Sequence, residues 1–186
     1  MFTGIIQAVG EVAAIEQTGG DVKLRIKTGD LPLEDVRLGD SIATNGVCLT
    51  VTELPGDGYW ADVSTESLSL TSLKSTVVGS AVNLEKSLTP TTALGGHLVS
   101  GHVDGLGRVV GLTRDARSWR VSIEAPSDLA RYIAQKGSIC VDGTSLTFNS
   151  VEGARIELNI IPQTWEETVF SGYALGTEVN LEVDVI

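Results

Sequence analysis

A thiol, a hydroxyl and two imidazoles are the side chains of this chain that could attack carbon or move a proton near neutral pH. Both histidines, His97 and His102, lie in the glycine-rich stretch Gly95–Gly105 near the middle of the sequence. Cys48 and Ser145 lie 97 residues apart, and each is followed by Leu-Thr. A lone cysteine or serine in such a setting is more often an ordinary strand residue, so spacing alone assigns them no chemistry.

Two other kinds of site fit these residues poorly. His97, His102 and Asp104 could be drawn as a metal site, but five-residue spacing puts the two rings on opposite faces of a regular strand. No third histidine or well-placed cysteine completes a ligand set. Ser145 lacks the GxSxG surroundings of a hydrolase nucleophile. We therefore expect no metal and no hydrolase triad.

The separation of 97 residues is a property of the whole chain. Four blocks repeat at this one shift without a gap: Gly4–Val12 with Gly101–Val109, Ser41–Thr50 with Ser138–Thr147, Thr71 with Thr168, and Val82–Glu85 with Val179–Glu182. A period this long indicates two copies of a small domain, not a stacking repeat. We predict domains at residues 1–97 and 98–186, joined through Leu88–Gly95.

Charge and cysteine usage exclude several classes of protein. The net charge of −11 should repel polyphosphate, so nucleic acid and anionic membranes are not expected partners. No basic flank precedes an apolar N-terminal segment, and no apolar run approaches a bilayer span, so a cytoplasmic location is expected. The two cysteines, Cys48 and Cys140, occupy non-equivalent positions in the two copies, which argues against a disulfide framework.

Short alternating runs predict an all-β fold. The runs of the first copy, bounded mostly by Gly, Pro, Asn or Asp, are Gly4–Ala14, Val22–Thr28, Ser41–Ala43, Cys48–Glu53, Tyr59–Val63 and Ala81–Leu88. Asn45-Gly46 and Asp142-Gly143 are typical of tight hairpin turns. Because so many short strands must not leave open edges, we predict two tandem, internally duplicated six-stranded Greek-key β-barrels.

Helix signals are few. They predict short helices at Leu31–Leu38, at Ser127–Gln135 with Ser127 as N-cap, at Ser67–Lys74 and at Thr164–Phe170.

Duplicated barrels predict two pockets of similar shape for two similar ligands. Differences of role should then lie where the copies differ: Cys48 stands opposite Ser145, and His102 stands opposite Ile5.

Five motifs in order on this duplication make the chain resemble riboflavin synthases over nearly its whole length. They are Met1–Ile6, Gly39–Val51, Gly95–Gly105, Lys136–Ser138 with Asp142–Thr147, and Ile161–Thr164 with Glu166–Thr168. The resemblance implies a transferase that moves a four-carbon unit between two molecules of 6,7-dimethyl-8-ribityllumazine, giving riboflavin and 5-amino-6-(ribitylamino)uracil. The same molecule would be donor in one domain and acceptor in the other, with no metal or organic cofactor.

The resemblance also implies site residues. The catalytic residues are Cys48, His102, Ser145 and Ser41, with Cys48 or Ser145 placing a nucleophile at lumazine C7 and His102 moving the C7 methyl proton. Around the first pocket it implies Phe2, Thr3, Gly4, Ile5, Ile6, Val47, Cys48, Leu49, Thr50, Asp62, Val63, Ser64, Thr65, Glu66 and Ser67. Around the second it implies His97, Gly101, His102, Val103, Lys136, Ser145, Leu146, Thr147, Ile160, Ile161, Pro162, Gln163, Thr164, Trp165 and Asp184.

Two departures from the family pattern carry expectations. Trp165 and Phe148 stand where the family usually has Leu and Val, which predicts a fuller second pocket. Family members usually continue past the last strand into a helix that joins three subunits, whereas this sequence ends at Asp184-Val185-Ile186. The family implies a homotrimer and an association with lumazine synthase, and the sequence leaves the oligomeric state open.

Two alternative functions are compatible with a duplicated barrel or a barrel of this type. A non-catalytic lumazine-binding protein shares the duplicated barrel, but such proteins lose polar residues that this chain keeps. A flavin-binding reductase barrel would need a separate nucleotide-binding domain, for which the chain has neither fingerprint nor length.

Overall fold

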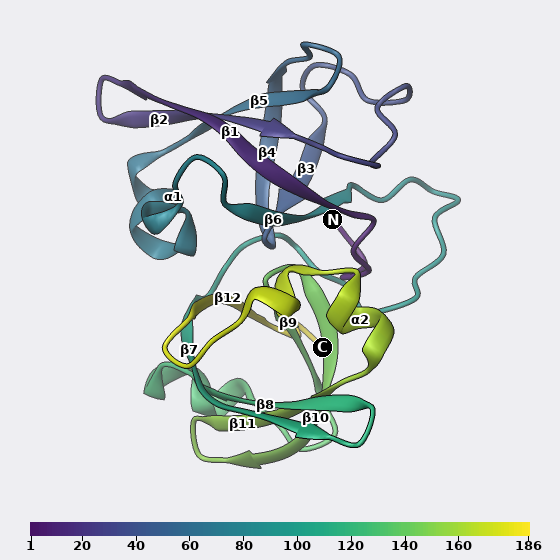
Figure 1. Ribbon diagram of the computed structural model, residues 1–186, viewed down its shortest axis with the longest axis vertical. Coiled ribbons are helices and arrows are strands. Elements are labelled where there is room, and N and C mark those ends of the chain that lie inside the picture. Colours follow the sequence, from purple (N-terminus) through teal and green to yellow (C-terminus); the bar gives the residue numbers. More distant parts are fainter.

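Twelve short strands form two closed antiparallel barrels, which lie one above the other in Figure 1. The computed structural model describes residues 1–186. The strands of the first barrel are β1 (Ala8–Thr18), β2 (Asp21–Lys27), β3 (Ser41–Thr44), β4 (Val47–Glu53), β5 (Gly58–Val63) and β6 (Ala81–Lys86). Their order around the barrel is β1-β2-β5-β4-β3-β6.

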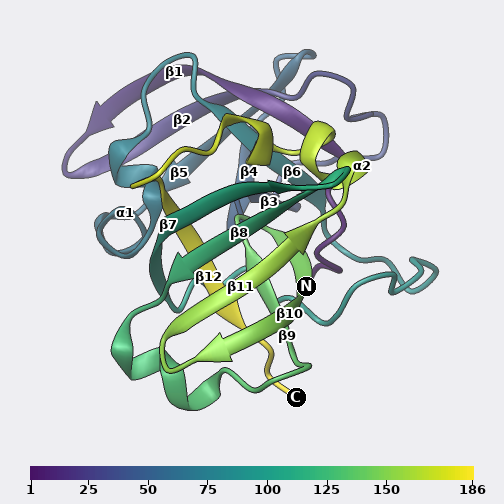
Figure 2. The ribbon, with the colours of Figure 1, turned by 60° about the horizontal axis from the view of Figure 1, so that its bottom comes forward.

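The second barrel repeats this architecture and faces the viewer in Figure 2. Its strands are β7 (Gly105–Asp115), β8 (Ser118–Glu124), β9 (Ser138–Val141), β10 (Thr144–Glu152), β11 (Arg155–Ile160) and β12 (Glu178–Val183). Their order is β10-β11-β8-β7-β12-β9. The predicted pair of six-stranded barrels is therefore confirmed, while the exact division after residue 97 stays a prediction.

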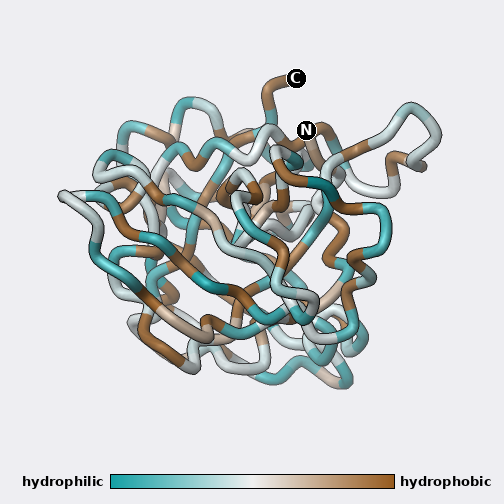
Figure 3. The backbone as a smooth tube through the Cα atoms, turned by 90° about the horizontal axis from the view of Figure 1, so that it is seen from above, coloured by the Kyte–Doolittle hydropathy of each residue, from teal (hydrophilic) through white to brown (hydrophobic).

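Alternating side chains build each barrel core. In β2, Val22, Leu24 and Ile26 point inward, and the lysines and arginine between them face outward. Figure 3 shows this alternation of hydrophobic and hydrophilic residues along the strands. Register shifts in β1, β4, β7 and β10 bend the strands enough for a short sheet to close on itself.

The short helices differ from the predicted ones. Leu31–Leu38 forms separate turns without a helix, because Leu31 and Val36 both point into the core across the end of the barrel. The 3-10 helix η2 (Ser127–Tyr132) follows Pro126, and Ser127 does not cap it. None of the helices is long and apolar enough to cross a membrane.

Two equivalent helix pairs replace the predicted single helices. In the first copy, α1 (Thr65–Leu70) is capped by the Ser64 hydroxyl, and Thr71 then starts the 3-10 helix η1 (Ser72–Ser75). In the second copy, α2 (Pro162–Glu166) precedes η3 (Val169–Gly172), which Thr168 caps. The threonine in the middle of each predicted helix ends it, because its hydroxyl accepts a bond from the next turn.

The predicted hairpin turns join the two barrels. Asn45-Gly46 and Asp142-Gly143 have positive φ angles, as this tight turn type requires. The two turns pack directly against each other, since a Cβ at Gly46 would lie 2.7 Å from the backbone nitrogen of Gly143.

Two asparagines related by the duplication bond across the same interface. The Asn83 amide donates to the Asp142 carbonyl and accepts from the Val169 N–H. The Asn180 amide donates to the Asn45 carbonyl and accepts from the Ser72 N–H. These reciprocal bonds give the barrel pair a twofold pseudo-symmetry.

Candidate functional site

Two extended segments run side by side between the barrels, where Figure 1 places the N-terminus. Phe2 and Val99 exchange backbone hydrogen bonds of 2.7 and 3.1 Å, and His97 N–H donates to the Thr3 carbonyl. Each segment then reaches the barrel of the other copy. The Ser145 N–H donates to the Gly4 carbonyl at 2.7 Å, and the Cys48 N–H donates to the Gly101 carbonyl at 2.9 Å.

The first crossing creates a hollow of about 250 Å³ over the second barrel, which we name the Ser145 pocket. It is lined by Gly4, Ile5, Ile6, Thr144, Ser145, Gln163, Thr164, Glu167 and Thr168.

The second crossing creates the equivalent hollow, of about 230 Å³, over the first barrel, which we name the Cys48 pocket. It is lined by Val47, Cys48, Glu66, Ser67, Leu70, Thr71, Gly101, His102 and Val103. Every residue of one pocket lies 97 positions from a residue of the other, so the duplication is realised as two equivalent pockets.

The crossing corrects the expected grouping of residues. Gly4–Ile6 line the pocket of the second barrel, and Gly101–Val103 line the pocket of the first. The reverse was expected, because the duplication assigns each segment to its own copy. His102 therefore lies beside Cys48 and away from Ser145.

The two pockets differ in their polar groups. The Cys48 pocket combines a half-buried thiol, the His102 imidazole and the Glu66 carboxylate. At the same three positions the Ser145 pocket has a hydroxyl, an isoleucine and an amide. The Ser145 pocket has a carboxylate of its own in Glu167, where the Cys48 pocket has Leu70, so the imidazole in the lining is what sets the Cys48 pocket apart.

His97 lies behind the Ser145 pocket. Its Nδ1 lies 2.7 Å from the Ser145 Oγ, while its buried Nε2 has no hydrogen-bond partner. Burial lowers the pKa of His97, and this effect outweighs the carboxylates of Asp184 and Glu182, which raise it. The imidazole is therefore neutral at pH 7 and available to hydrogen-bond the serine hydroxyl. No three metal-ligating side chains gather anywhere in the structure.

Buried carboxylates hold both crossing segments in place. Glu85 on β6 accepts the Thr3 N–H and hydroxyl at 2.7 and 2.6 Å and the Gly4 N–H at 3.0 Å. Burial raises the pKa of Glu85, and the bonds from Thr3 and Gly4 oppose this effect. Glu182 on β12 holds Ser100 and Gly101 in the same way.

Several predicted site residues lie outside both pockets. Phe2, Leu49, Val63 and Ile160 are core residues, and Thr3 is buried against Glu85. Ser41 lines a separate hollow beside Lys86 and pairs with Thr50 across the strands. Outer or part-exposed positions are occupied by Thr50, Asp62, Ser64, Thr65, Lys136, Leu146, Thr147, Ile161 and Asp184.

The two bulky residues expected to fill the second pocket do not line it. Trp165 turns to the other side of α2, where it stacks on Trp119 at 4.4 Å between ring centroids. Together with Arg114 and Arg117 these rings and Pro162 line a separate hollow. Phe148 is buried in the core of the second barrel.

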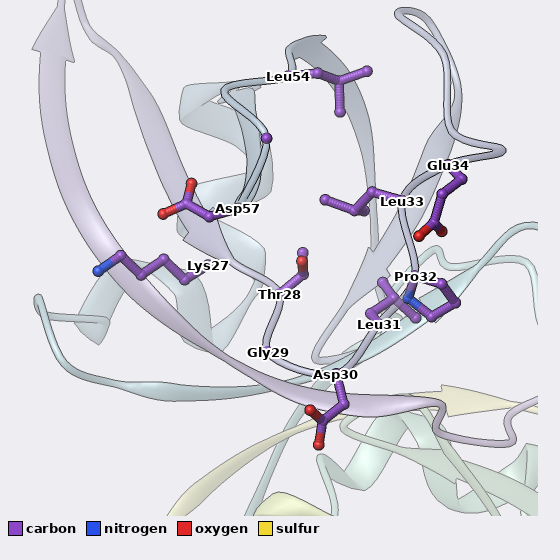
Figure 4. A pocket seen from close by; sticks show the side chains of 11 residues that line it. Lys27, Thr28, Gly29, Asp30, Leu31, Pro32, Leu33, Glu34, Leu54 and Asp57 are labelled. Atoms are coloured by element: carbon purple, nitrogen blue, oxygen red, sulfur yellow. The ribbon is translucent and has the colours of Figure 1, made fainter.

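The largest hollow, of about 780 Å³, lies at the outer end of the first barrel. Figure 4 shows its lining, which runs from Lys27 to Glu34 and continues through Leu54 and Asp57. It contains none of the predicted site residues, no cysteine and no histidine, and most of its lining is exposed. We therefore place the candidate site in the two smaller, equivalent pockets.

Sequence reasoning missed seven residues at these pockets. They are Leu70, Thr71, Thr144, Glu167 and Thr168 in the linings, and Glu85 and Glu182 behind them. The repeated blocks around Thr71 and Glu85 contained the signal, because both residues recur unchanged after 97 positions.

Two equivalent pockets on a pair of fused barrels define a duplicated ligand-binding barrel protein. The family model of the lumazine binding domain matches residues 3–87 and 100–184. Riboflavin synthase from Photobacterium phosphoreum is 48% identical over 186 residues, which cover 100% of this chain and 85% of that protein. The chain therefore belongs to the riboflavin synthase family of duplicated lumazine-binding proteins.

Further relatives agree. Riboflavin synthase from Mycobacterium tuberculosis H37Rv is 44% identical, covering 100% of this chain and 94% of that protein. Among solved structures, LumP complexed with riboflavin superposes with a TM-score of 0.90 at 27% identity, covering 98% of this chain and 99% of that chain. LumP complexed with 6,7-dimethyl-8-(1'-D-ribityl) lumazine gives a TM-score of 0.87 at 26% identity and the same coverage.

Proposed function

We propose that the chain is a riboflavin synthase, a transferase that converts two molecules of 6,7-dimethyl-8-ribityllumazine into riboflavin and 5-amino-6-(ribitylamino)uracil. The observation that carries this proposal is the pair of equivalent pockets with unlike polar groups. A dismutation needs the same molecule bound twice, once as donor and once as acceptor of the four-carbon unit. The relatives named riboflavin synthase support the same reaction.

The two pockets suggest how the work is divided. In the Cys48 pocket, His102 is placed to take the C7 methyl proton and Cys48 to supply a nucleophile at C7. In the Ser145 pocket, the hydroxyl beside neutral His97 is the corresponding nucleophile. Because only the Cys48 pocket has a histidine in its lining, we infer that proton abstraction takes place there.

Each pocket is small enough that it would hold the lumazine ring and leave the ribityl chain outside. In the first copy the ribityl chain of the ligand would run along the outer faces of β3 and β4, past Ser41 and Thr50. In the second it would pass Thr147, Lys136 and Asp184.

We also propose assembly into a homotrimer in the cytoplasm, with association to lumazine synthase. Ile5 at the Ser145 pocket is 49% exposed, and Leu70 at the Cys48 pocket is 53% exposed. Apolar residues at the mouth of a pocket are suited to being covered by a neighbouring subunit. Covering would also exclude water from the bound ring.

A non-catalytic lumazine-binding protein is the second candidate, because the LumP structures share the fold over the whole chain. The retained Cys48, His102 and Ser145 favour the enzyme, since binding alone does not require them.

The deciding experiment mixes the purified protein with 6,7-dimethyl-8-ribityllumazine and follows riboflavin absorbance, with light scattering on the same sample. Growth of riboflavin supports the enzyme. A shifted lumazine spectrum without riboflavin would instead favour the binding protein. The mass of the active species tests the trimer separately.

A further inference from the structure

Two buried carboxylates hold the segments that cover the pockets, although neither carboxylate lines a pocket. Glu182 bonds Ser100 N–H and Oγ at 2.5 and 2.8 Å and Gly101 N–H at 2.9 Å. Gly101 then accepts the Cys48 N–H through its carbonyl, and the next two residues line the Cys48 pocket. Glu85 is connected to the Ser145 pocket in the same way through Gly4.

Both carboxylates are suited to fixing a backbone position. Glu85 is 3% exposed and Glu182 is 4% exposed, and neither forms a salt bridge. Each is held by three hydrogen bonds from one dipeptide, so any movement of that dipeptide would leave a buried charge unpaired.

Gly4 and Gly101 are closely packed against the residues that they cover. A Cβ at Gly101 would lie 2.7 Å from Cys48 Cβ, and a Cβ at Gly4 would lie 2.6 Å from Ser145 Cβ. A small shift of either glycine would therefore be transmitted directly to the reactive side chain of the pocket it covers.

We propose that Glu85 and Glu182 are positioning residues that act crosswise: Glu85, on the first barrel, sets the geometry of the Ser145 pocket, and Glu182, on the second barrel, sets that of the Cys48 pocket. This inference deepens the proposed function and rests on it for its role in the reaction. The positioning itself can be measured without any substrate.

The test uses thiol labelling, because Cys48 is half-buried in its pocket and the other cysteine, Cys140, is buried. The rate of reaction with 5,5'-dithiobis(2-nitrobenzoate) therefore reports on the Cys48 pocket. A Cys48→Ser, Ser145→Cys double variant moves this reporter to the Ser145 pocket. Each reporter is combined with Glu85→Gln and with Glu182→Gln.

A glutamine retains one oxygen acceptor but presents an NH2 group where the second oxygen was, so one N–H of the dipeptide loses its partner. Glu182→Gln should speed labelling at position 48 by about tenfold and leave position 145 unchanged, and Glu85→Gln should do the reverse. Thr3→Val and Ser100→Ala each remove one bond to the carboxylate, together with the bond that the same hydroxyl accepts from the N–H of Ile5 or His102. They should change labelling with the same pocket specificity.

Equal changes at both thiols, or no change at either, would overturn the inference. Measuring lumazine turnover tests the proposed reaction separately from the positioning. Riboflavin formation should fall in both glutamine variants, because the reaction needs both pockets. Crosswise labelling without riboflavin formation would support the positioning and contradict the proposed reaction. A protein that makes riboflavin without crosswise labelling loses the positioning alone.

Discussion

Single side chains distinguish two pockets whose linings occupy equivalent positions in the two copies. His102 stands opposite Ile5 and Cys48 stands opposite Ser145, so the duplicated frame supplies two binding places and these residues supply the difference. Chemistry is therefore expected to respond to substitution at these positions more strongly than binding does.

The first prediction concerns proton transfer and nucleophilic attack. His102→Gln and Cys48→Ser should each lower riboflavin formation by at least about tenfold, because a positioned acid or base contributes this much or more. Steady-state absorbance measures the rates. Arg108→Gln, a surface variant on β7 that loses an exposed pair with Glu178, is the control and should remain fully active. Full activity in both pocket variants would disprove these roles.

The second prediction concerns Asp142, whose counterpart in the first copy is the neutral Asn45. Burial raises the pKa of the Asp142 carboxyl to about 7, although bonds from Tyr173 and Asn180 lower it. The unfolded chain releases this proton near pH 4, so the folded state binds more protons between about pH 4 and 7. Stability should therefore fall as the pH rises through this window.

Asp142→Asn removes this titration and keeps an acceptor for the Asn180 N–H. The variant should be more stable than the parent by roughly 2 to 4 kcal/mol at pH 8 and about equal to it near pH 4. Urea unfolding at both pH values measures the difference. The exposed Asp128→Asn serves as control, and a pH-independent difference for Asp142→Asn would contradict the assignment.

At the level of secondary structure, two hairpin turns pack against each other between the barrels. The turn between β3 and β4 and the turn between β9 and β10 each close a tight hairpin, and they also form the contact between barrels. Their glycines therefore serve both a backbone conformation and a close approach.

The third prediction separates these two requirements. Gly46→Ala introduces a Cβ at a positive φ angle and against the backbone of Gly143, and it should cost roughly 2 to 4 kcal/mol. Gly153→Ala has a similar φ angle with open space around it, and it should cost only about 1 kcal/mol. Chemical denaturation measures the loss of unfolding free energy in each variant. Equal losses would show that the contact between the two turns contributes nothing to stability.

At the scale of the whole molecule, neither barrel completes a pocket by itself. Each pocket combines a barrel of one copy with a segment of the other, so the shape of each pocket depends on the contact between the barrels. The asparagine exchange contributes four side-chain hydrogen bonds to that contact.

The fourth prediction follows from that exchange. In a variant with both Asn83→Ala and Asn180→Ala, four buried or half-buried backbone groups lose their partners. Scanning calorimetry should then resolve two unfolding transitions where the parent shows one. Thr52→Ala, which removes a bond within the first barrel, should leave the transition single. One transition in the double variant would mean that the asparagine bonds are not needed to couple the barrels.

The duplication, the six strands of each copy and the positions of the tight turns could be predicted from the residues alone. These features are local or strictly periodic: alternation shows in β2 as Val22, Leu24 and Ile26, and the turn type follows from Asn45-Gly46. The predictions of a helix at Leu31–Leu38 and of a single helix around Thr71 are wrong. Burial of Leu31 and Val36 prevents the first helix, and the Thr71 cap divides the second.

Which segment covers which pocket could not be predicted and follows from contacts in the folded chain. The contacts responsible join residues far apart in sequence, such as Gly4 with Ser145 and Gly101 with Cys48. The duplication itself does not reveal the answer, because two barrels of the same topology present equivalent N–H groups to either segment. The choice depends on the path of the chain between the barrels, to which no residue pattern corresponds.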